Sequence, residues 1–192
     1  KEVADSIYNY LTNIGGNPGR SNHIHSMKSN RILYSTREKI ASFFNYDSLE
    51  NIIFTKNITE SLNILINGFL NEGDHVITSS MEHNAVIRPL YLLKESRNIE
   101  LSIVKANDLG IIDTNKIKKE IKNNTKAIII THASNIVGSI HPIKEIGALC
   151  KKNDIFFILD SAQTAGVIPI DFKALNLSAL AFTGHKSLMG PQ

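Results

Sequence analysis

The sequence has little of what several classes of protein require. Its 192 residues include a single cysteine, which excludes a disulfide framework and a zinc site of several cysteines and fits a reducing compartment. The longest apolar runs, at residues 127–130 and 155–159, are far shorter than the roughly 20 residues that cross a bilayer. A formal net charge of +3 is too small to indicate a nucleic-acid-binding protein. The first residues show no secretory signal, so we expect a cytoplasmic protein.

What the sequence does contain is a regular alternation of short β-branched runs and stretches of helical spacing. With 42% hydrophobic and 20% charged residues, it has the composition of a folded globular protein. The alternation predicts an α/β fold in three layers, α/β/α, with a mostly parallel sheet covered by helices on both faces. The expected strands are residues 52–55, 75–79, 99–104, 126–131, 155–159 and 179–183, and the expected helices between them are residues 59–70, 84–96, 114–122 and 142–152.

Ahead of the first expected strand, the spacing predicts two further helices. They cover residues 2–12 and 27–44, and a segment rich in turn-forming residues separates them. We therefore expect an N-terminal helical segment with its loop at residues 1–45 and an α/β domain at residues 46–192. The chain opens inside an amphipathic helix without a capping residue and stops directly after a glycine-containing segment, so we expect a fragment of a longer protein.

Polar residues follow two of the expected strands, at the edge where ligands bind in open α/β sheets. Asp160 follows the apolar run at residues 155–159, and a carboxylate delivered to such a buried edge is costly unless a cation pairs with it. Taken alone, Asp160 also fits a helix N-cap or a structural ion pair. After the last expected strand, residues 183–186 place a hydroxyl, an imidazole and an amine on one tight turn. Taken alone, Lys186 also fits an ordinary solvated lysine.

The two features together fit a pyridoxal phosphate site. Such a site requires an amine that forms a Schiff base with the cofactor and an anion that pairs with the pyridine nitrogen. Lys186 supplies the amine and Asp160 supplies the anion. The carboxylate keeps the ring nitrogen protonated, which makes the ring an electron sink, and the pyridinium supplies the cation that a buried Asp160 lacks.

Several segments of the sequence resemble the class V aminotransferase family of fold-type I pyridoxal phosphate enzymes, and within it the cysteine desulfurase branch. They follow one another in the family's order over essentially the whole chain. The segments are Gly-Asn-Pro-Gly-Arg-Ser at 16–21, Thr-Lys-Asn-Ile-Thr-Glu at 55–60, Ser-Met-Glu-His-Asn-Ala-Val at 80–86, His-Ala-Ser-Asn-Ile-Val-Gly at 132–138, Asp-Ser-Ala-Gln at 160–163 and Thr-Gly-His-Lys at 183–186.

The resemblance implies a role for each matching residue. Lys186 resembles the lysine that binds the cofactor and then acts as acid or base near the substrate α-carbon, and Asp160 resembles the partner of the ring nitrogen. His83 resembles the histidine that stacks on the ring face and takes part in proton transfer. Gln163 resembles the residue that hydrogen-bonds the phenolic ring oxygen, and Asn135 resembles the asparagine near that oxygen and the substrate carboxylate.

The resemblance also implies a place for the cofactor phosphate, at the start of the helix expected at residues 59–70. Free backbone N–H groups and the helix dipole favour an anion there. Ile58 would donate a backbone N–H group, and Thr59, Thr183 and His185 would add side-chain donors. The family often has Gly-Thr-Thr in this loop, whereas this chain has Asn-Ile-Thr, so one hydroxyl contact is not matched.

Other residues fit ordinary structural roles. Cys150 lies within the helix expected at residues 142–152 and fits packing; it does not match the desulfurase nucleophile, which the resemblance implies beyond Gln192. No G-x-G-x-x-G motif follows a strand, which removes the main support for a nicotinamide-binding protein. We expect no metal site, because the histidines lack metal-ligand spacing; they include His23, His25, His75, His132 and His141.

The resemblance implies a homodimeric cysteine desulfurase that converts L-cysteine to alanine and an enzyme persulfide, with a sulfur-acceptor protein as partner. This chain would carry the cofactor-binding half and be inactive alone. The persulfide cysteine, the arginine that binds the substrate carboxylate and the small C-terminal domain would follow Gln192. Another class V enzyme, such as a selenocysteine lyase, an epimerase or an aminotransferase of a small amino acid, would share every matching residue. A non-catalytic fragment that keeps the fold and a generic nucleotide-binding module are the remaining hypotheses.

Overall fold

The computed structural model describes residues 1–19 and 23–191, which form two compact units. One unit contains Lys1–Phe54 together with the chain end from Met189, and the other contains Thr55–Leu188. The second unit holds the sheet and every candidate site residue.

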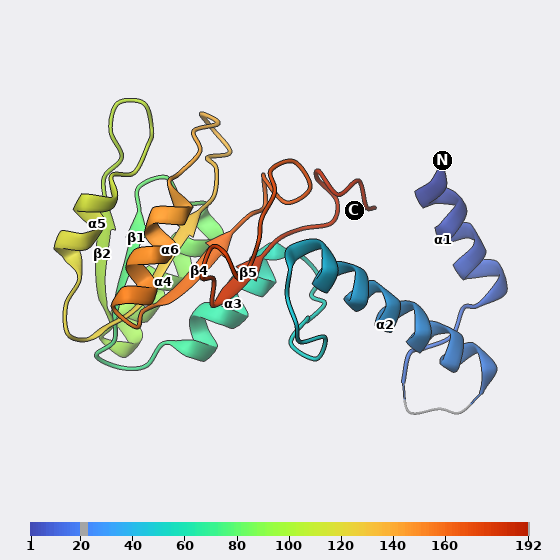
Figure 1. Cartoon of the computed structure of the whole chain (residues 1–192). Helices are drawn as coiled ribbons and strands as arrows, with labels where there is room; N and C mark the ends of the chain where they lie inside the picture. Colours follow the sequence, from blue (N-terminus) through green and yellow to red (C-terminus); the bar gives the residue numbers. More distant parts are fainter. Residues whose placement is uncertain (20–22, 192) are drawn as a thin grey trace. The chain divides into compact units, whose positions relative to one another are not determined.

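The sheet of this unit has five strands, and every neighbouring pair is parallel (Figure 1). The strand order is β2-β1-β3-β4-β5. The first strand of the chain, β1, therefore pairs with β2 on one side, and β3, β4 and β5 follow in turn on its other side. The strands are β1 (His75–Ser79), β2 (Glu100–Val104), β3 (Thr125–Thr131), β4 (Phe156–Asp160) and β5 (Ala179–Ala181). All five residues of β1 are buried, as expected of a parallel strand that has a neighbour on each side and helices over both faces of its sheet.

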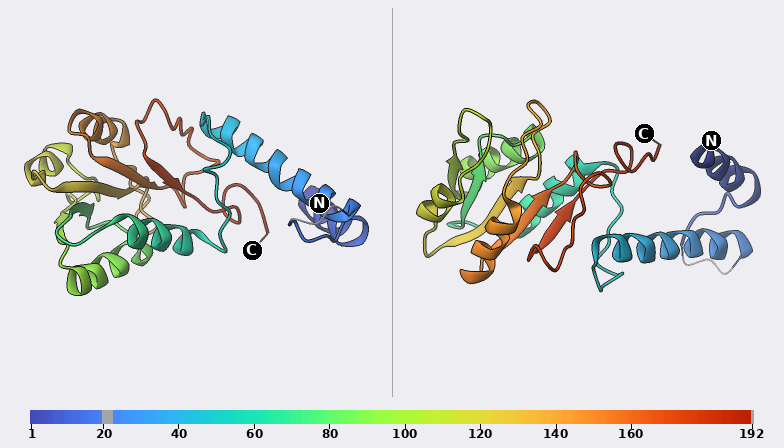
Figure 2. Two further views of the ribbon diagram at one scale, coloured as in Figure 1. Left: turned by 90° about the horizontal axis from the view of Figure 1, so that it is seen from below. Right: turned by 45° about the horizontal axis from the view of Figure 1, so that its top comes forward.

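Four helices fill the connections and cover the sheet on both faces. Figure 2 shows α3 and α4 on one side of the sheet and α5 and α6 on the other. The helices are α3 (Ile58–Phe69), α4 (Asn84–Arg97), α5 (Thr114–Glu120) and α6 (Ile143–Lys152). The predicted three-layer α/β/α arrangement with a parallel sheet is therefore confirmed.

The larger part of the core lies between the sheet and the layer formed by α3 and α4. Leu62, Ile66 and Leu70 recur at intervals of four residues, which gives α3 one continuous apolar face. This face packs with buried side chains of α4 and of the strands, among them Val86, Leu90, Val76, Ala127, Ile129 and Ile158. On the opposite face Ile117 of α5 and Ile146 of α6 are completely buried.

Side-chain caps fix where three of these helices begin. Asn57 accepts the backbone N–H of Glu60, His83 accepts that of Ala85, and Asp113 accepts that of Asn115. Each cap satisfies a first-turn donor that has no partner within its own helix. The observed bounds of these elements differ from the predicted ones by only a few residues.

The strand predicted at residues 52–55 is wrong, because these residues form no strand. The backbone carbonyl of Ile52 accepts a hydrogen bond from the Arg37 side chain at 3.0 Å, and the Ile53 side chain is 67% exposed. A β-branched and aromatic run becomes a strand only when a neighbouring strand pairs with it, and among the described residues none pairs with this one.

Within its described residues, the first unit contains two helices, α1 (Glu2–Asn13) and α2 (Ile24–Phe44). Hydrogen bonds to Gly16 connect the two helices: its carbonyl oxygen accepts from the Tyr10 hydroxyl of α1 and from the Ser29 hydroxyl of α2, both at 2.7 Å. A side chain at Gly16 would collide with the backbone of His25, so the close approach requires glycine. Arg20 and Ser21, which complete the family-like segment at residues 16–21, lie outside the described residues.

Among residues 1–19 and 23–191, no helix is both long and apolar enough to span a membrane. No three side chains of His, Cys, Asp or Glu gather closely enough to hold a metal ion.

The space around two helical glycines predicts opposite effects on stability when each is replaced by alanine. A methyl group at Gly147 would lie 2.0 Å from the carbonyl oxygen of Leu175, whereas one at Gly68 of α3 would meet nothing within 4 Å. We expect Gly147→Ala to lower the free energy of unfolding by about 2–3 kcal/mol through overpacking, and Gly68→Ala to raise it by up to about 1 kcal/mol through helix propensity. Urea unfolding followed by circular dichroism measures both; a Gly147→Ala chain as stable as the wild type would contradict the packing described.

Candidate active site

The carboxyl edge of the sheet brings together the candidate residues. In a parallel sheet the loops that follow the strands all leave from this edge, which is where ligands bind in open α/β folds. His83 follows β1, Asn135 follows β3, Gln163 follows β4, and Thr183 follows β5, while Asp160 is the last residue of β4. Because β1, β3, β4 and β5 are neighbours in that order, these residues share one side of the unit.

Asp160 is the buried anion of this edge. Only 3% of the residue is exposed, and its Oδ1 accepts the backbone N–H of Ala162 at 2.9 Å. Oδ2 accepts no hydrogen bond from any residue that the structure describes. Burial raises the pKa of Asp160 above its ordinary value, while the Ala162 N–H group, His83 and Lys186 act in the opposite direction. Burying the ionised carboxylate thus costs free energy that the groups around it offset only in part, and further positive charge would stabilise it.

His83 and Lys186 are the two basic side chains that lower the pKa of Asp160 against the effect of its burial. Both are exposed, so both are accessible to a ligand. His83 also caps α4, because its Nδ1 accepts the backbone N–H of Ala85 at 3.1 Å. That hydrogen bond requires an unprotonated Nδ1, which leaves Nε2 to carry the proton of the neutral ring.

The turn after β5 is fixed by one internal contact. Thr183 is buried, and its Oγ1 lies 2.9 Å from Nδ1 of His185. His185 and Lys186, which follow, are exposed. The strand ends at Ala181, two residues earlier than predicted, and this frees Thr183 and the residues after it to form the turn.

The first turn of α3 has unused backbone donors. Asn57 accepts the N–H of Glu60 at 2.9 Å, and the Glu60 carboxylate accepts the N–H of Lys56 at 2.6 Å. Among the described residues, the N–H groups of Ile58 and Thr59 donate to no acceptor. Free donors at a helix N-terminus attract an anion. The Glu60 carboxylate in the same turn weakens this attraction.

Two observations place this turn at the carboxyl edge. The helix ends shortly before β1 begins, so it runs back along the sheet in the opposite direction to the strand (Figure 1). At its far end Arg97, the last residue of α4, donates to the carbonyl oxygens of Asn67 and Leu70. The carboxyl ends of α3 and α4 therefore lie together, and both helices begin at the edge that holds His83.

Asn135 and Gln163 are near this edge without being joined to the other candidates. Asn135 is exposed in a turn whose shape is set by Ser134, whose Oγ accepts the N–H groups of Ile136 and Val137 at 3.3 and 3.4 Å. Gln163 is half-buried. Neither side chain makes a hydrogen bond to another described residue.

Sequence reasoning missed Glu82, which lies directly before His83. Its Oε1 accepts the Ser79 hydroxyl at 2.5 Å and the backbone N–H of Thr131 at 3.0 Å. Its Oε2 is buried without a hydrogen-bond partner among the described residues. Burial raises the pKa of Glu82 to about 8, and the nearby Asp160 carboxylate contributes to the rise. The signal in the sequence was only its place between β1 and a capping histidine.

Two buried histidines follow β3 without joining the candidate residues. Burial lowers the pKa of His132 to about 4, with a contribution from His141, so both rings are neutral near pH 7. Nδ1 of His132 and both ring nitrogens of His141 lack hydrogen-bond partners in the described part of the chain. Neutral buried rings of this kind fit a packing role.

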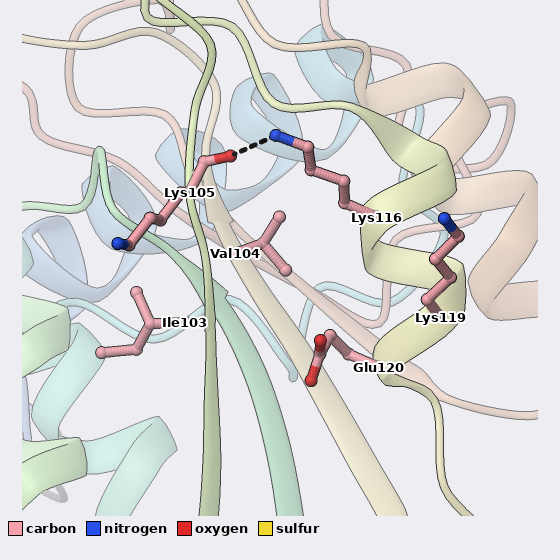
Figure 3. A pocket seen from close by; sticks show the side chains of 6 residues that line it. All are labelled: Ile103, Val104, Lys105, Lys116, Lys119 and Glu120. Atoms are coloured by element: carbon pink, nitrogen blue, oxygen red, sulfur yellow. Dashed lines mark hydrogen bonds between the residues drawn. The ribbon is translucent and has the colours of Figure 1, made fainter.

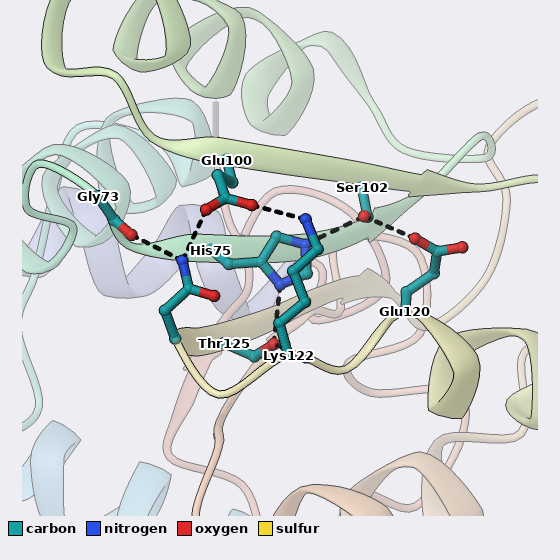
Figure 4. A network of polar contacts seen from close by, with 8 residues as sticks. Gly73, His75, Glu100, Ser102, Glu120, Lys122 and Thr125 are labelled. Atoms are coloured by element: carbon teal, nitrogen blue, oxygen red, sulfur yellow. Dashed lines mark hydrogen bonds and ion pairs between the residues drawn. The ribbon is translucent and has the colours of Figure 1, made fainter.

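Two further polar features lie away from Asp160. Figure 3 shows a pocket of about 170 Å³ between β2 and α5, lined by Ile103, Val104, Lys105, Lys116, Lys119 and Glu120. Since β2 is an edge strand, β1 and β3 separate this pocket from β4. Figure 4 shows a network at the opposite edge, where the strands begin: His75 lies 2.8 Å from Thr125 and 3.0 Å from Ser102. This network also contains the ion pair between Lys122 and Glu100, at 2.6 Å.

The residues at the carboxyl edge fit pyridoxal phosphate by the chemistry of their donors and acceptors. Asp160 is a buried anion that needs a cation, and the ring nitrogen of the cofactor supplies one. Lys186, whose charge acts on the same carboxylate, offers an amine that is accessible to a ligand. The free donors of α3 suit a phosphate.

Comparisons with known proteins give the family. The chain matches the family described as aminotransferase class-V over residues 1–192. It is 32% identical over 190 residues to a probable cysteine desulfurase of Methanothermobacter thermautotrophicus, which covers 98% of this chain and 47% of that protein. It is 35% identical over 197 residues to the cysteine desulfurase IscS of Buchnera aphidicola, covering 100% of this chain and 48% of that protein.

The chain also matches solved structures over nearly its whole length. The apo structure of a cysteine desulfurase from Thermococcus onnurineus matches with a TM-score of 0.92 and 31% identity, over 99% of this chain and 48% of that one. A structure described as SspA in complex with cysteine also matches with a TM-score of 0.92 and 31% identity, over 100% of this chain and 55% of that one. The chain thus spans about half the length of the curated relatives it matches. Because the family model matches residues 1–192, the chain belongs to the aminotransferase class-V family.

Proposed function

We propose that this chain is the cofactor-binding half of a pyridoxal 5′-phosphate-dependent cysteine desulfurase. The observation that carries the proposal is the buried Asp160 carboxylate at the carboxyl edge of the sheet, where the basic side chains of His83 and Lys186 act on it electrostatically. The names of the curated relatives, and the cysteine named in one structural match, support the substrate. The reaction moves sulfur from L-cysteine to an enzyme thiol and leaves L-alanine and an enzyme persulfide.

Each candidate residue has a role in this proposal. The cofactor, when bound, supplies an electron sink for charge at the substrate α-carbon. Lys186 would hold the cofactor through its amine and, once released, would move a proton at that carbon. Asp160 would accept a hydrogen bond from the ring nitrogen, and His83, with the proton of its neutral form on Nε2, would contact the ring. Gln163 would donate a hydrogen bond to the ring oxygen, and Asn135 would lie near that oxygen and the substrate carboxylate.

The phosphate contacts complete the binding site. Ile58 and Thr59 offer backbone N–H groups at the start of α3, and the hydroxyl groups of Thr59 and Thr183 add donors. His185 contributes from its exposed place after Thr183.

Cys150 is not the sulfur-accepting thiol of this proposal. It is completely buried in α6, and burial raises the pKa of its thiol to about 12. Since the thiolate is the nucleophile, a thiol of this kind is inert near pH 7. The accepting cysteine then belongs to the rest of the protein.

We also propose that the whole protein is a cytoplasmic homodimer that delivers sulfur to an acceptor protein, with residues 46–192 as its cofactor-binding domain.

Lys186 is predicted to be the one lysine that captures the cofactor. Incubation of the chain with pyridoxal phosphate, followed by borohydride reduction and peptide mass spectrometry, should locate a stoichiometric pyridoxyl adduct on Lys186. Lys186→Ala should abolish it, while Lys144→Ala, which removes an exposed lysine of α6, should not. Adducts spread over several lysines and unchanged in Lys186→Ala would contradict the assignment.

Replacing Asp160 should change cofactor affinity and stability in opposite directions. Asp160→Asn keeps the oxygen that accepts from Ala162 but removes the buried charge, so the free protein should be as stable as the wild type or up to about 1 kcal/mol more stable. Its affinity for pyridoxal phosphate should fall by about tenfold or more, because the charged partner of the ring nitrogen is lost. Thermal unfolding and equilibrium dialysis measure the two effects. Asp108→Asn, in an exposed loop, is the control. Equal affinities for pyridoxal phosphate in the wild type, Asp160→Asn and Asp108→Asn would contradict the proposed role of Asp160.

The proposed reaction is tested on the full-length protein. With L-cysteine and pyridoxal phosphate it should release L-alanine in step with transferred sulfur, and Lys186→Ala should release none. Turnover of another small amino acid without any alanine from cysteine would identify a different class V activity.

A further inference from the structure

Glu82 links the loop that carries His83 to the end of the strand next to Asp160. Its Oε1 accepts hydrogen bonds from the Ser79 hydroxyl, at the end of β1, and from the backbone N–H of Thr131, the last residue of β3. The Ser79 hydroxyl in turn accepts the backbone N–H of Met81 at 3.1 Å. One carboxyl group therefore ties together the ends of two neighbouring strands.

The strand end that Glu82 holds is the one that positions Asp160. Thr131 is the register partner of Asp160 in the pairing of β3 with β4. The next residue, His132, donates its backbone N–H to the carbonyl oxygen of Asp160 at 2.8 Å. A shift of Thr131 would thus move Asp160, and a shift of Glu82 would move the adjacent His83.

The geometry also indicates which protonation state Glu82 adopts. Oε2 is buried and receives no hydrogen bond from any described residue, although a carboxylate needs donors on both oxygens. The charged group that acts on it is the Asp160 carboxylate across the β3–β4 edge. Two buried carboxylates so placed do not both ionise readily. Burial raises the pKa of Asp160, but His83 and Lys186 lower it, which favours ionisation of Asp160 rather than of Glu82.

We propose that Glu82 is a positioning residue of the cofactor site: a neutral carboxylic acid that holds Thr131, and through it Asp160, while leaving Asp160 as the single buried anion. This inference rests on the proposed cofactor site for its purpose, but the arrangement of Glu82 itself can be tested without the cofactor. Glutamine reproduces the neutral acid, because it keeps the accepting oxygen and places an uncharged donor where the acid holds its proton.

The first test follows the stability of the cofactor-free chain against pH. Burial raises the pKa of Glu82 from its ordinary 4.5 to about 8. The folded state therefore holds the proton more tightly than the unfolded state, and the stabilisation is lost as the pH rises through this range. The thermal midpoint of the wild type should fall relative to that of Glu82→Gln from about pH 5 to about pH 8 and then run parallel to it. Groups that do not interact with Glu82 titrate alike in the two proteins and cancel in the difference, whereas Asp160 interacts with Glu82 and belongs to the pair that the comparison measures.

The second test measures binding of pyridoxal phosphate at pH 7 by equilibrium dialysis. Glu82→Gln should bind within about threefold of the wild type, whereas Glu82→Ala should bind about tenfold or more weakly, because Thr131 and Ser79 lose their shared acceptor. Glu95→Gln, an exposed residue of α4, is the matched control and should change neither measurement.

The outcomes separate this inference from the proposed function. Parallel pH profiles for wild type and Glu82→Gln, or binding by Glu82→Gln as weak as by Glu82→Ala, would overturn the neutral positioning role. Failure of the wild type to bind pyridoxal phosphate would count against the proposed function instead, and the pH profiles would still decide the state of Glu82. If Glu82→Ala does not fold, the comparison of the wild type with Glu82→Gln decides alone.

Discussion

The carboxylate of Asp160 lies buried at the end of β4, and the arrangement around it follows from the need to stabilise that charge. The hydrogen bond from Ala162 offsets part of the cost of burial, and the basic side chains of His83 and Lys186 act on the carboxylate in the same direction. A positively charged ligand would stabilise the buried carboxylate further. The ring nitrogen of pyridoxal phosphate would meet this need, and the same interaction would tune the cofactor.

The parallel sheet is what allows several distant segments to meet at this charge. Every βα unit returns the chain to the same edge, so each strand ends where a functional loop begins. Helices α3 and α4 add their N-termini there, and Arg97 holds their opposite ends together through the carbonyl groups of Asn67 and Leu70. A rigid core beneath the edge keeps these loops in place, which is the usual relation between a scaffold and a site.

Much of this arrangement could be predicted from the sequence because it depends on local patterns. An apolar run that ends in Asp160 marks both the strand and its carboxyl end, and the helical spacing at residues 59–70 and 84–96 marks two of the helices. The strand predicted at residues 52–55 was wrong because composition alone does not provide a neighbouring strand. Glu82 was missed because one of its partners, Thr131, lies far away in the sequence and donates through its backbone, which no side-chain pattern indicates.

The interaction between Asp160 and the cofactor ring is the central claim, and a crystal structure of the chain with pyridoxal phosphate tests it most directly. The account predicts an Asp160 carboxylate oxygen within hydrogen-bond distance of the ring nitrogen, with Lys186 at the reactive carbon and the phosphate at the first turn of α3. A cofactor bound with its ring nitrogen in solvent, or in the pocket beside β2, would contradict it.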